Sequence, residues 1–499
     1  MASNLPDYVT SAKPVPSDAR VKWFANIAPT YAGVMVWFAF WENVPGYGGT
    51  PGGLLSAGLM PALLGVVLAA LLIHFLFYLV PGLLGMKTGL PLYVVGTSTY
   101  GVQGGLILPG LFMGVLQFFW LGFNAFFIAT VLCQCFEIGL NGKGEVAIPG
   151  MTHGVIAVVW TLASALVGLK GIQYVAKIAT PFPLIPIAVL VILTASTIGG
   201  LSGFAPEKTY QASHVAASAS EAPSGENAKA AETATAQANK PQPLGAGAAI
   251  LATIACIAGF FATAGAAGVD IAMNSSDAKN VQKGGLMGIA LATVFSAGLS
   301  LVIVAGYYGG ADQVPANLAG KLDPVVLMKG GILSADFAKV LMILLAISSF
   351  PAACFSAFIA ANSFKTVLPK INPFLSVGVG AAGSCILAAT GWAGNAASVF
   401  GLIGASFGPV CGAMAADYLL AGKKWAGPRA GINLAGWISW LLGFVVGAPD
   451  LFAMIPGLDF LRGSIPCPPM AAFIVGFVLY FVLAKVGLQS KTLEMPATA

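Results

Sequence analysis

Long apolar stretches separated by short polar segments make up most of the chain. A stretch of about 20 apolar residues is long enough to cross a bilayer as a helix. Such stretches occupy, approximately, residues 24–44, 54–83, 104–138, 153–171, 178–200, 247–276, 285–308, 332–362, 374–395, 397–421, 430–448 and 467–487. The pattern therefore predicts an all-α membrane protein with about twelve transmembrane helices. An even number of spans places both termini on one side of the membrane.

One long polar segment divides this pattern. Residues 204–243 are rich in Ala, Ser, Glu and Pro, and they carry too little apolar area to fold alone, so we expect a disordered external loop there. The predicted organisation is a cytoplasmic tail at 1–22, helices 1–5 at 23–203, the loop at 204–243, helices 6–10 at 244–422, helices 11–12 at 423–488 and a cytoplasmic tail at 489–499.

The two groups of five spans suggest an inverted repeat, because an odd number of spans turns the second copy upside down. The corresponding first and sixth spans are both interrupted. Pro29, Thr30 and Gly33 interrupt the first, and Gly265 and Gly268 interrupt the sixth. Broken helices at matching positions are typical of a binding site at the bilayer midplane. Glycine-rich membrane helices also pack closely without unwinding, so both interpretations stay open.

Composition and charge narrow the class of protein further. Hydrophobic residues make up 58% of the 499 and charged residues 8%, whereas a soluble domain carries about 25% charged residues. The net charge of +5 is spread over many loops, which argues against a nucleic-acid partner. Lys and Arg are enriched in the segments that face the cytoplasm when the N-terminus lies inside, so we expect both termini to be cytoplasmic.

Polar side chains lie on one face of the third span. Gln117, Trp120 and Asn124 follow one another at spacings of three and four residues, which places them on one helical face. An indole beside carboxamides suits a flat heterocycle, because the ring stacks and the amide hydrogen-bonds its edge. Amides also join membrane helices to one another, and spacing alone leaves both roles open. Phe260 and Phe261 are candidates for a second stacking surface, although single Phe side chains more often pack in the core.

Oxygen-bearing side chains in two further spans are candidates for ion binding. Ser348 and Ser349 precede Pro351, which lacks an amide hydrogen and frees the carbonyl of Ile347. Hydroxyl and carbonyl oxygens suit Na⁺, although serines in membrane helices also bond back to their own backbone. Asp270 lies inside the sixth span, where an acid is costly. It is a candidate proton carrier, support for a cation site, partner of the opened backbone or helix cap.

Asp417 ends the tenth span near Lys423 and Lys424, a pattern that favours anchoring at the membrane interface over a functional role.

Several local motifs occur in a fixed order along the chain. They are VPSDAR before the first span, Trp41 at its end, GMKTGL and STYGVQGG around the second, Gln117 with Trp120 in the third, AGAAGVD in the sixth, Ser348–Ser349 in the eighth, GPVCGAMAADYLL in the tenth and Asn433 at the start of the eleventh. In these motifs the chain resembles the nucleobase:cation symporter-1 family, and within it the cytosine/purine permease branch.

The resemblance implies the five-plus-five inverted-repeat fold of sodium-coupled amino acid transporters, and ion-driven uptake by alternating access. Carried over by position, the cation site comprises the backbone carbonyls of Ala32, Met35 and Leu345 and the hydroxyls of Ser348 and Ser349. The implied substrate site comprises Gln117, Trp120, Phe261 and the backbone near Gly265, to which the residue pattern adds Asn124 and Asp270. The chain departs from the family at Phe350, Pro351 and Ala352, where polar residues are common, and at Met273, where Arg is common.

Together, these features predict a secondary transporter that imports a nucleobase or related planar heterocycle with a cation, Na⁺ or else H⁺. The alternatives are an H⁺-coupled transporter of allantoin, a hydantoin, a vitamin or an amino acid on the same fold, and a non-transporting membrane receptor. No catalytic residue and no cofactor besides the coupling ion are predicted, because the chain shows neither HExxH, nor a Ser/His pair at membrane depth, nor GxxxxGK[ST]. The expected partners are the small-molecule substrate and the lipid of an inner or plasma membrane, without an obligate protein partner.

Overall fold

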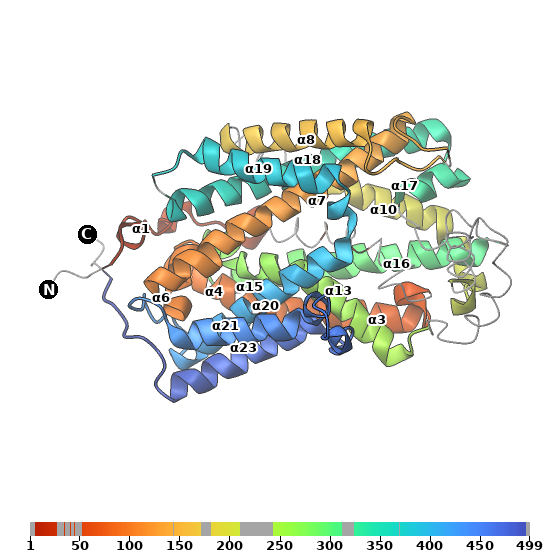
Figure 1. Cartoon of the computed structure of the whole chain (residues 1–499). Coiled ribbons are helices and arrows are strands. Elements are labelled where there is room, and N and C mark those ends of the chain that lie inside the picture. Colours follow the sequence, from red (N-terminus) through yellow and green to blue (C-terminus); the bar gives the residue numbers. More distant parts are fainter. Residues whose placement is uncertain are drawn as a thin grey trace.

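The computed structural model describes residues 5–26, 34, 40, 44, 52–142, 144–170, 181–209, 243–311, 324–368 and 370–495. These residues form a bundle of long helices (Figure 1). In this part of the chain there is no β-strand, and only three isolated bridges pair extended residues. The all-α membrane fold expected from the sequence is confirmed. Most of the predicted first span lies outside the described residues, so the count of twelve spans and the inverted repeat stay predictions.

The helices used below have the following bounds: α1 (Asp7–Thr10), α3 (Leu59–Leu72), α4 (Leu79–Thr88), α5 (Leu92–Val95), α6 (Thr97–Gly105), α7 (Met113–Phe136), α8 (Met151–Lys170), α10 (Leu184–Thr197), α13 (Ala246–Ala266), α14 (Gly268–Ala272), α15 (Ala278–Gly285), α16 (Ala292–Gly310), α17 (Pro324–Leu327), α18 (Ala335–Val367), α19 (Pro373–Ala389), α20 (Ala396–Leu420), α21 (Leu434–Gly447), α22 (Pro449–Phe452) and α23 (Pro468–Lys485). Short π-helical or 3-10 turns join several of them into continuous rods.

Among the described residues, nine rods are long and apolar enough to cross a membrane. They are Leu59–Thr88, Thr97–Phe136, Met151–Lys170, Leu184–Gly203, Ala246–Ala266, Ala278–Gly310, Ala335–Lys365, Ser398–Leu420 and Pro468–Lys485. Two shorter apolar helices, Phe374–Ala389 and Leu434–Gly447, also coincide with predicted spans. The third span begins earlier than its apolar run, because the polar segment TSTYGVQGG is itself helical. The seventh begins at Ala278, because the Asp277 side chain caps the helix there.

The helices form two groups with α7 between them. In Figure 1, α8, α18 and α19 run along the upper side, α20, α21 and α23 along the lower side, and α7 crosses obliquely between them. The contacts agree with this view, since α7 packs against α8, α18 and α19, while α20 packs against α13, α21 and α23. Helix α13 therefore packs with the lower group.

Small residues permit close packing in the lower group. Pro409 lies inside α20, and a Cβ added to Gly443 on α21 or to Gly476 on α23 would come within 2.6 Å of it. Small residues at such crossings let membrane helices approach closely, and the approach increases the van der Waals contact that holds them together. The three helices therefore form a tightly packed unit around Pro409.

Helix α6 is broken at Gly101, which has φ 82° and ψ 162°. Only glycine adopts this backbone conformation without strain. The segment after α20 supplies the missing partners, because the amides of Val102 and Gln103 donate to the carbonyls of Arg429 and Gly431 at 2.8 and 2.9 Å. A Cβ at Gly101 would lie 2.3 Å from the Gly431 carbonyl oxygen, so the close approach also requires glycine.

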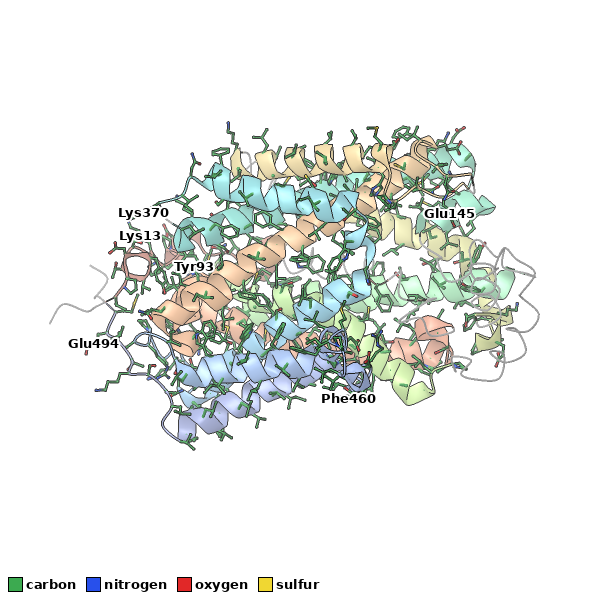
Figure 2. All side chains as sticks on the ribbon, in the orientation of Figure 1. Lys13, Tyr93, Glu145, Lys370, Phe460 and Glu494 are labelled. Carbon is green, nitrogen blue, oxygen red and sulfur yellow. The ribbon has the colours of Figure 1, made fainter. Side chains whose placement is uncertain are left out.

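Both terminal segments pack at the α6 end of the bundle. The Tyr8 hydroxyl, on α1, donates to the carbonyl of Val102, and the Arg429 guanidinium donates to the carbonyl of Ser490 at 3.1 Å. Lys13 and Glu494 lie at this end in Figure 2, whereas Glu145 lies at the opposite end. The two ends of the described chain therefore lie at the same end of the bundle.

Asp417 does not anchor its helix through the nearby lysines, contrary to the sequence interpretation. Its side chain is buried and forms an ion pair with Arg429 at 3.2 Å, and it accepts a hydrogen bond from the Tyr480 hydroxyl at 2.7 Å. The partner arginine lies on the segment that folds back over α6. This cluster fastens the ends of α20 and α23 to the broken helix.

Candidate functional site

The predicted interruption of the sixth span lies at Ala267, between α13 and α14. Gly265 and Gly268 flank it, and glycine is unfavourable in a helix interior by about 1 kcal/mol. The interruption is shallow, because the Ala267 amide still donates to Thr263 at 2.8 Å and the Ile271 amide to Ala267 at 2.9 Å. Helical hydrogen bonding therefore continues through this level, and no long unwound segment is exposed.

The two glycines also allow close packing against the second span. A Cβ at Gly265 would lie 2.7 Å from the Cβ of Phe77, and one at Gly268 would lie 3.0 Å from the ring of Tyr78. The close-packing interpretation of these glycines is therefore confirmed, and the interpretation as a broken helix at a binding site stays a prediction. The predicted first-span break and the carbonyls of Ala32 and Met35 lie outside the described residues.

Trp120 lies on α7 in a cluster of aromatic rings. Its indole meets the ring of Phe260 edge-on at 4.9 Å and stacks on the ring of Phe400 at 5.7 Å with an interplanar angle of 29°. Phe123 lies edge-on at 5.8 Å. The indole Nε1–H donates to the Thr263 hydroxyl at 3.1 Å, which fixes the plane of the ring. Trp120 is therefore a partly buried stacking surface joined to α13 just before the interruption.

Phe260, not Phe261, faces the indole. Adjacent residues on a helix point in directions about 100° apart, so only one of the pair faces α7. Phe260 is partly buried and contacts both Trp120 and Phe400. The Phe261 side chain is fully buried in the apolar core. The structure thus gives Phe260 the position that the sequence resemblance gave to its neighbour.

Gln117 is buried one turn before Trp120 on α7. Its Nε2 donates to the Met113 sulfur at 3.5 Å. A thioether is a weak acceptor, so a ligand with a carbonyl or ring nitrogen displaces this bond at little cost. The carboxamide is therefore suited to hydrogen-bond the edge of a ring that lies against the indole.

Asn124 lies one turn after Trp120, and both ends of its carboxamide are bonded within the protein. Its Nδ2 donates to the carbonyl of Ser349 at 3.3 Å, and its Oδ1 accepts from the indole of Trp160 at 2.9 Å. These bonds join α7 to α18 and to α8. Of the three polar residues predicted to share a face, Trp120 thus contacts α13, Gln117 bonds within α7, and Asn124 ties neighbouring helices together.

Ser348 and Ser349 are buried on α18 and bond back to their own helix. Their hydroxyls donate to the carbonyls of Leu345 and Ala346, each at 2.8 Å. A hydroxyl that donates its hydrogen still has two lone pairs. Back-bonding therefore fixes the rotation of each hydroxyl and is compatible with cation binding. The pair precedes Pro351, which lies inside α18.

Asp270 lies on α14, and its Oδ1 accepts a hydrogen bond from the backbone amide of Leu92 at 2.9 Å. Leu92 begins α5, in the connection between the second and third spans. Of the roles considered from the sequence, this contact is most like that of a helix cap. Asp270 bonds the first amide of α5, however, and not an amide of its own helix. In the described part of the chain, no three His, Cys, Asp or Glu side chains gather in a way that would hold a metal ion.

Three residues that contact the candidate residues were not predicted from the sequence: Phe400 and Thr263, which contact Trp120, and Trp160, which contacts the bridging residue Asn124 and Phe350. The position of Phe400 follows from the packing of α20 on α13, which no local pattern reveals. Thr263 lies three residues after Phe260, so the two side chains share one face of the helix. Once Trp120 and Phe260 are assigned to the site, this spacing predicts that Thr263 lies there too. Trp160 stands in an otherwise apolar stretch, where a buried indole N–H needs an acceptor.

No family model matches the chain. Among curated proteins, it is similar to the allantoin permease of Bacillus subtilis (strain 168), with 36% identity over 98 residues. The match covers 19% of this chain and 20% of the permease, so the similar region spans about a fifth of that relative.

Solved transporter structures resemble the whole chain at low sequence identity. Mhp1, a nucleobase-cation-symport-1 family transporter, has a TM-score of 0.60 in a closed conformation with bromovinylhydantoin bound, at 16% identity over 97% of each chain. Its inward-facing conformation has a TM-score of 0.61 at 16% identity, covering 98% of this chain and 97% of Mhp1. A Na⁺-coupled sialic acid symporter in an outward-open state has a TM-score of 0.53 at 13% identity, covering 98% of this chain and 93% of the symporter.

These likenesses confirm the expected fold over nearly the whole chain, and they are to transporters rather than enzymes. The protein is an integral, multi-pass membrane protein. Its fold is that of the nucleobase-cation-symport-1 transporter Mhp1, whose family its sequence motifs resemble.

Proposed function

We propose that the protein is a secondary active transporter that imports a nucleobase or related planar heterocycle of the cytosine/purine class together with Na⁺, by alternating access. The observation that carries the proposal is the aromatic cluster around Trp120, beside the buried amide of Gln117 and level with the interruption at Ala267. A transporter needs such a site in mid-bilayer, whereas a structural helix contact gains nothing from a weakly bonded amide.

A planar ring fits this cluster if it enters between Trp120 and Phe400. The centroids of the two rings lie 5.7 Å apart. Two stacking layers need roughly 7 Å, because carbon atoms in contact lie about 3.5 Å apart. Phe400 therefore retreats by roughly 1 Å or more when the ring enters. Because Phe400 is on α20, binding would shift that helix relative to α7, which couples occupancy to the conformation of the bundle.

The coupling ion binds at the hydroxyl pair. Ser348 and Ser349 provide fixed hydroxyl oxygens, and Leu345 provides a carbonyl on the same turn. The carbonyls of Ala32 and Met35 complete the set by resemblance to the family. Na⁺ binding there would favour the state that also binds substrate, and a differential affinity of a few kcal/mol is enough to couple the two.

The protein crosses a cell membrane with both termini in the cytoplasm. The packing of both terminal segments at the α6 end supports a common side. Lys13 and Lys370 lie at this end in Figure 2, whereas the acidic Glu145 lies at the other. Cationic loops stay preferentially in the cytoplasm, so the α6 end is the cytoplasmic one.

A second candidate is H⁺-coupled transport of allantoin or a hydantoin on the same fold. The segment shared with an allantoin permease and the bromovinylhydantoin bound to Mhp1 favour it. A vitamin or amino acid is a weaker alternative, because Asp270 is bonded to Leu92 and provides no clamp for a zwitterion. A receptor that binds without transporting would show binding but no accumulation.

A thermal-shift screen of purified protein tests the proposal. The panel contains cytosine, purine bases, allantoin, a hydantoin and an amino acid, each with and without NaCl against matched choline chloride. The proposal expects stabilisation by a cytosine or purine ligand that is larger in Na⁺. Stabilisation by allantoin or hydantoin independent of Na⁺ favours the second candidate, and no stabilisation by any planar ring contradicts both.

A further inference from the structure

The carboxamide of Asn124 forms a bridge between three helices beside the proposed site. It is partly buried on α7, with one hydrogen bond to the backbone of α18 and one to the Trp160 side chain of α8. A carboxamide in two protein hydrogen bonds gives up both when it turns to a ligand. Gln117, by contrast, gives up only a weak bond to sulfur.

The bridge reaches α18 next to the hydroxyl pair. Asn124 donates to the carbonyl of Ser349, the second residue of that pair. Pro351, two residues further on, lacks an amide hydrogen, so this part of α18 lacks one of its internal bonds. A helix weakened in this way rotates and bends more easily. An outside donor at Ser349 opposes that movement.

Trp160 holds the bridge from the opposite side. Its Nε1–H donates to Asn124 at 2.9 Å, and its ring meets the ring of Phe350 edge-on at 5.1 Å. Phe350 follows Ser349 directly in the sequence. Trp160 therefore contacts the same turn of α18 twice, once through Asn124 and once through Phe350.

We propose that Asn124, held by Trp160, is a positioning residue that sets the Ser348 and Ser349 hydroxyls for Na⁺ and does not bind substrate. The inference rests on the proposed function and specifies its cation site. It also explains how substrate and ion are linked: Trp120 and Asn124 are one turn apart on α7, so a ring that shifts α20 relative to α7 acts on the helix that carries the donor to α18.

Trp160→Phe is the decisive variant, because it removes only the Nε1–H donor and keeps a ring against Phe350. Asn124→Leu removes both bonds at nearly the same size. Trp425→Phe is the matched control, since it removes an equally long, partly buried indole bond to the carbonyl of Val95 at 2.9 Å, away from α18. The first readout is the Na⁺ concentration that gives half the maximal rise in unfolding temperature, measured without substrate against choline chloride.

We expect Trp160→Phe to raise the half-saturating Na⁺ concentration about three- to tenfold, the range that one neutral hydrogen bond accounts for. Asn124→Leu raises it at least as much, and the double variant no further, because both changes break one bridge. Trp425→Phe leaves it unchanged. The second readout is the substrate KM at saturating Na⁺, which stays within twofold of wild type in each variant. If the bonds were merely structural, all three single variants would have a lower unfolding temperature, and none would have a changed half-saturating Na⁺ concentration.

The results separate this inference from the proposed function. An unchanged half-saturating Na⁺ concentration in Trp160→Phe overturns the inference, as does an Asn124→Leu protein whose KM rises while Na⁺ saturation is unchanged. A wild-type protein without any Na⁺-dependent shift also overturns it, and leaves H⁺-coupled transport standing. A Na⁺ shift that depends on Trp160 in a protein that binds no planar heterocycle supports the inference and contradicts the proposed substrate class.

Discussion

Replacing Trp120 by alanine removes the stacking surface on which the proposed substrate site depends. The indole touches Phe260, Phe400 and Phe123 and is bonded to Thr263 at 3.1 Å. Stacking of a base on one aromatic side chain contributes about 1–3 kcal/mol. Because 1.4 kcal/mol corresponds to about a tenfold change in affinity, we expect Trp120→Ala to weaken binding roughly 5- to 150-fold.

The assay is equilibrium binding of radiolabelled cytosine, and of allantoin in parallel, to purified protein in NaCl. Trp392→Ala is the matched control, because its side chain is 63% exposed at the start of the connection to α20 and the same change removes no ring from the cluster. Trp120→Phe keeps a smaller ring and gives an intermediate affinity. A Trp120→Ala protein that is folded and binds within twofold of wild type would refute the reasoning and move the site elsewhere.

Three further changes test the packing and electrostatics of the fold. Asp417→Asn leaves the buried Arg429 without its anionic partner and lowers the free energy of unfolding by about 3 kcal/mol, measured by chemical denaturation in detergent. Gly85→Ala places a Cβ 2.1 Å from the carbonyl oxygen of Val269, so α4 and α14 must separate, and the cost of about 1–3 kcal/mol lowers the unfolding temperature. Asp277 caps α15, and the backbone amide hydrogen bond it accepts holds the pKa of its carboxyl below the usual range. The ionised Asp277 carboxylate thus stabilises the folded state above the unfolded-state pKa of about 3.9, and this stabilisation is lost as the pH falls through the depressed folded-state pKa. Asp277→Asn does not titrate, so it removes this part of the acid-induced loss of stability.

Each of these changes has its own control. Adding Arg429→Met to Asp417→Asn recovers part of the lost stability, because no buried charge is then left unpaired; a double variant less stable than the single one contradicts the ion-pair account. Gly298→Ala meets its nearest atom only at 3.8 Å, so it leaves the unfolding temperature unchanged or raises it. If wild type and Asp277→Asn lose stability identically below about pH 4, the cap does not titrate as described.

The sequence predicted the spans well where hydrophobicity alone decides them. A bilayer requires about 20 apolar residues per helix, so the length of each apolar run carries most of the information. Prediction from the sequence was less reliable where tertiary contacts provide the hydrogen-bond partners of backbone groups. The segment Thr97–Gly105 is polar yet helical, because the chain around Arg429 bonds the amides that the break at Gly101 leaves unpaired.

The candidate site shows the same division. Helical spacing correctly placed Gln117, Trp120 and Asn124 on one helix, but it could not say which neighbour each would meet. Phe400 reaches Trp120 only because α20 packs on α13. Which of Phe260 and Phe261 faces Trp120 depends on how α13 is rotated about its own axis. Contacts on both sides of α13 set that rotation.

The central claim is that Na⁺ bound at Ser348 and Ser349 drives uptake of a planar heterocycle. Uptake of radiolabelled cytosine into proteoliposomes, under an imposed inward Na⁺ gradient or an imposed proton gradient, tests it most directly. The account predicts accumulation only with the Na⁺ gradient, and loss of that stimulation when both serines are replaced by alanine. Accumulation that follows the proton gradient, and is equal in wild type and the double variant, would contradict it.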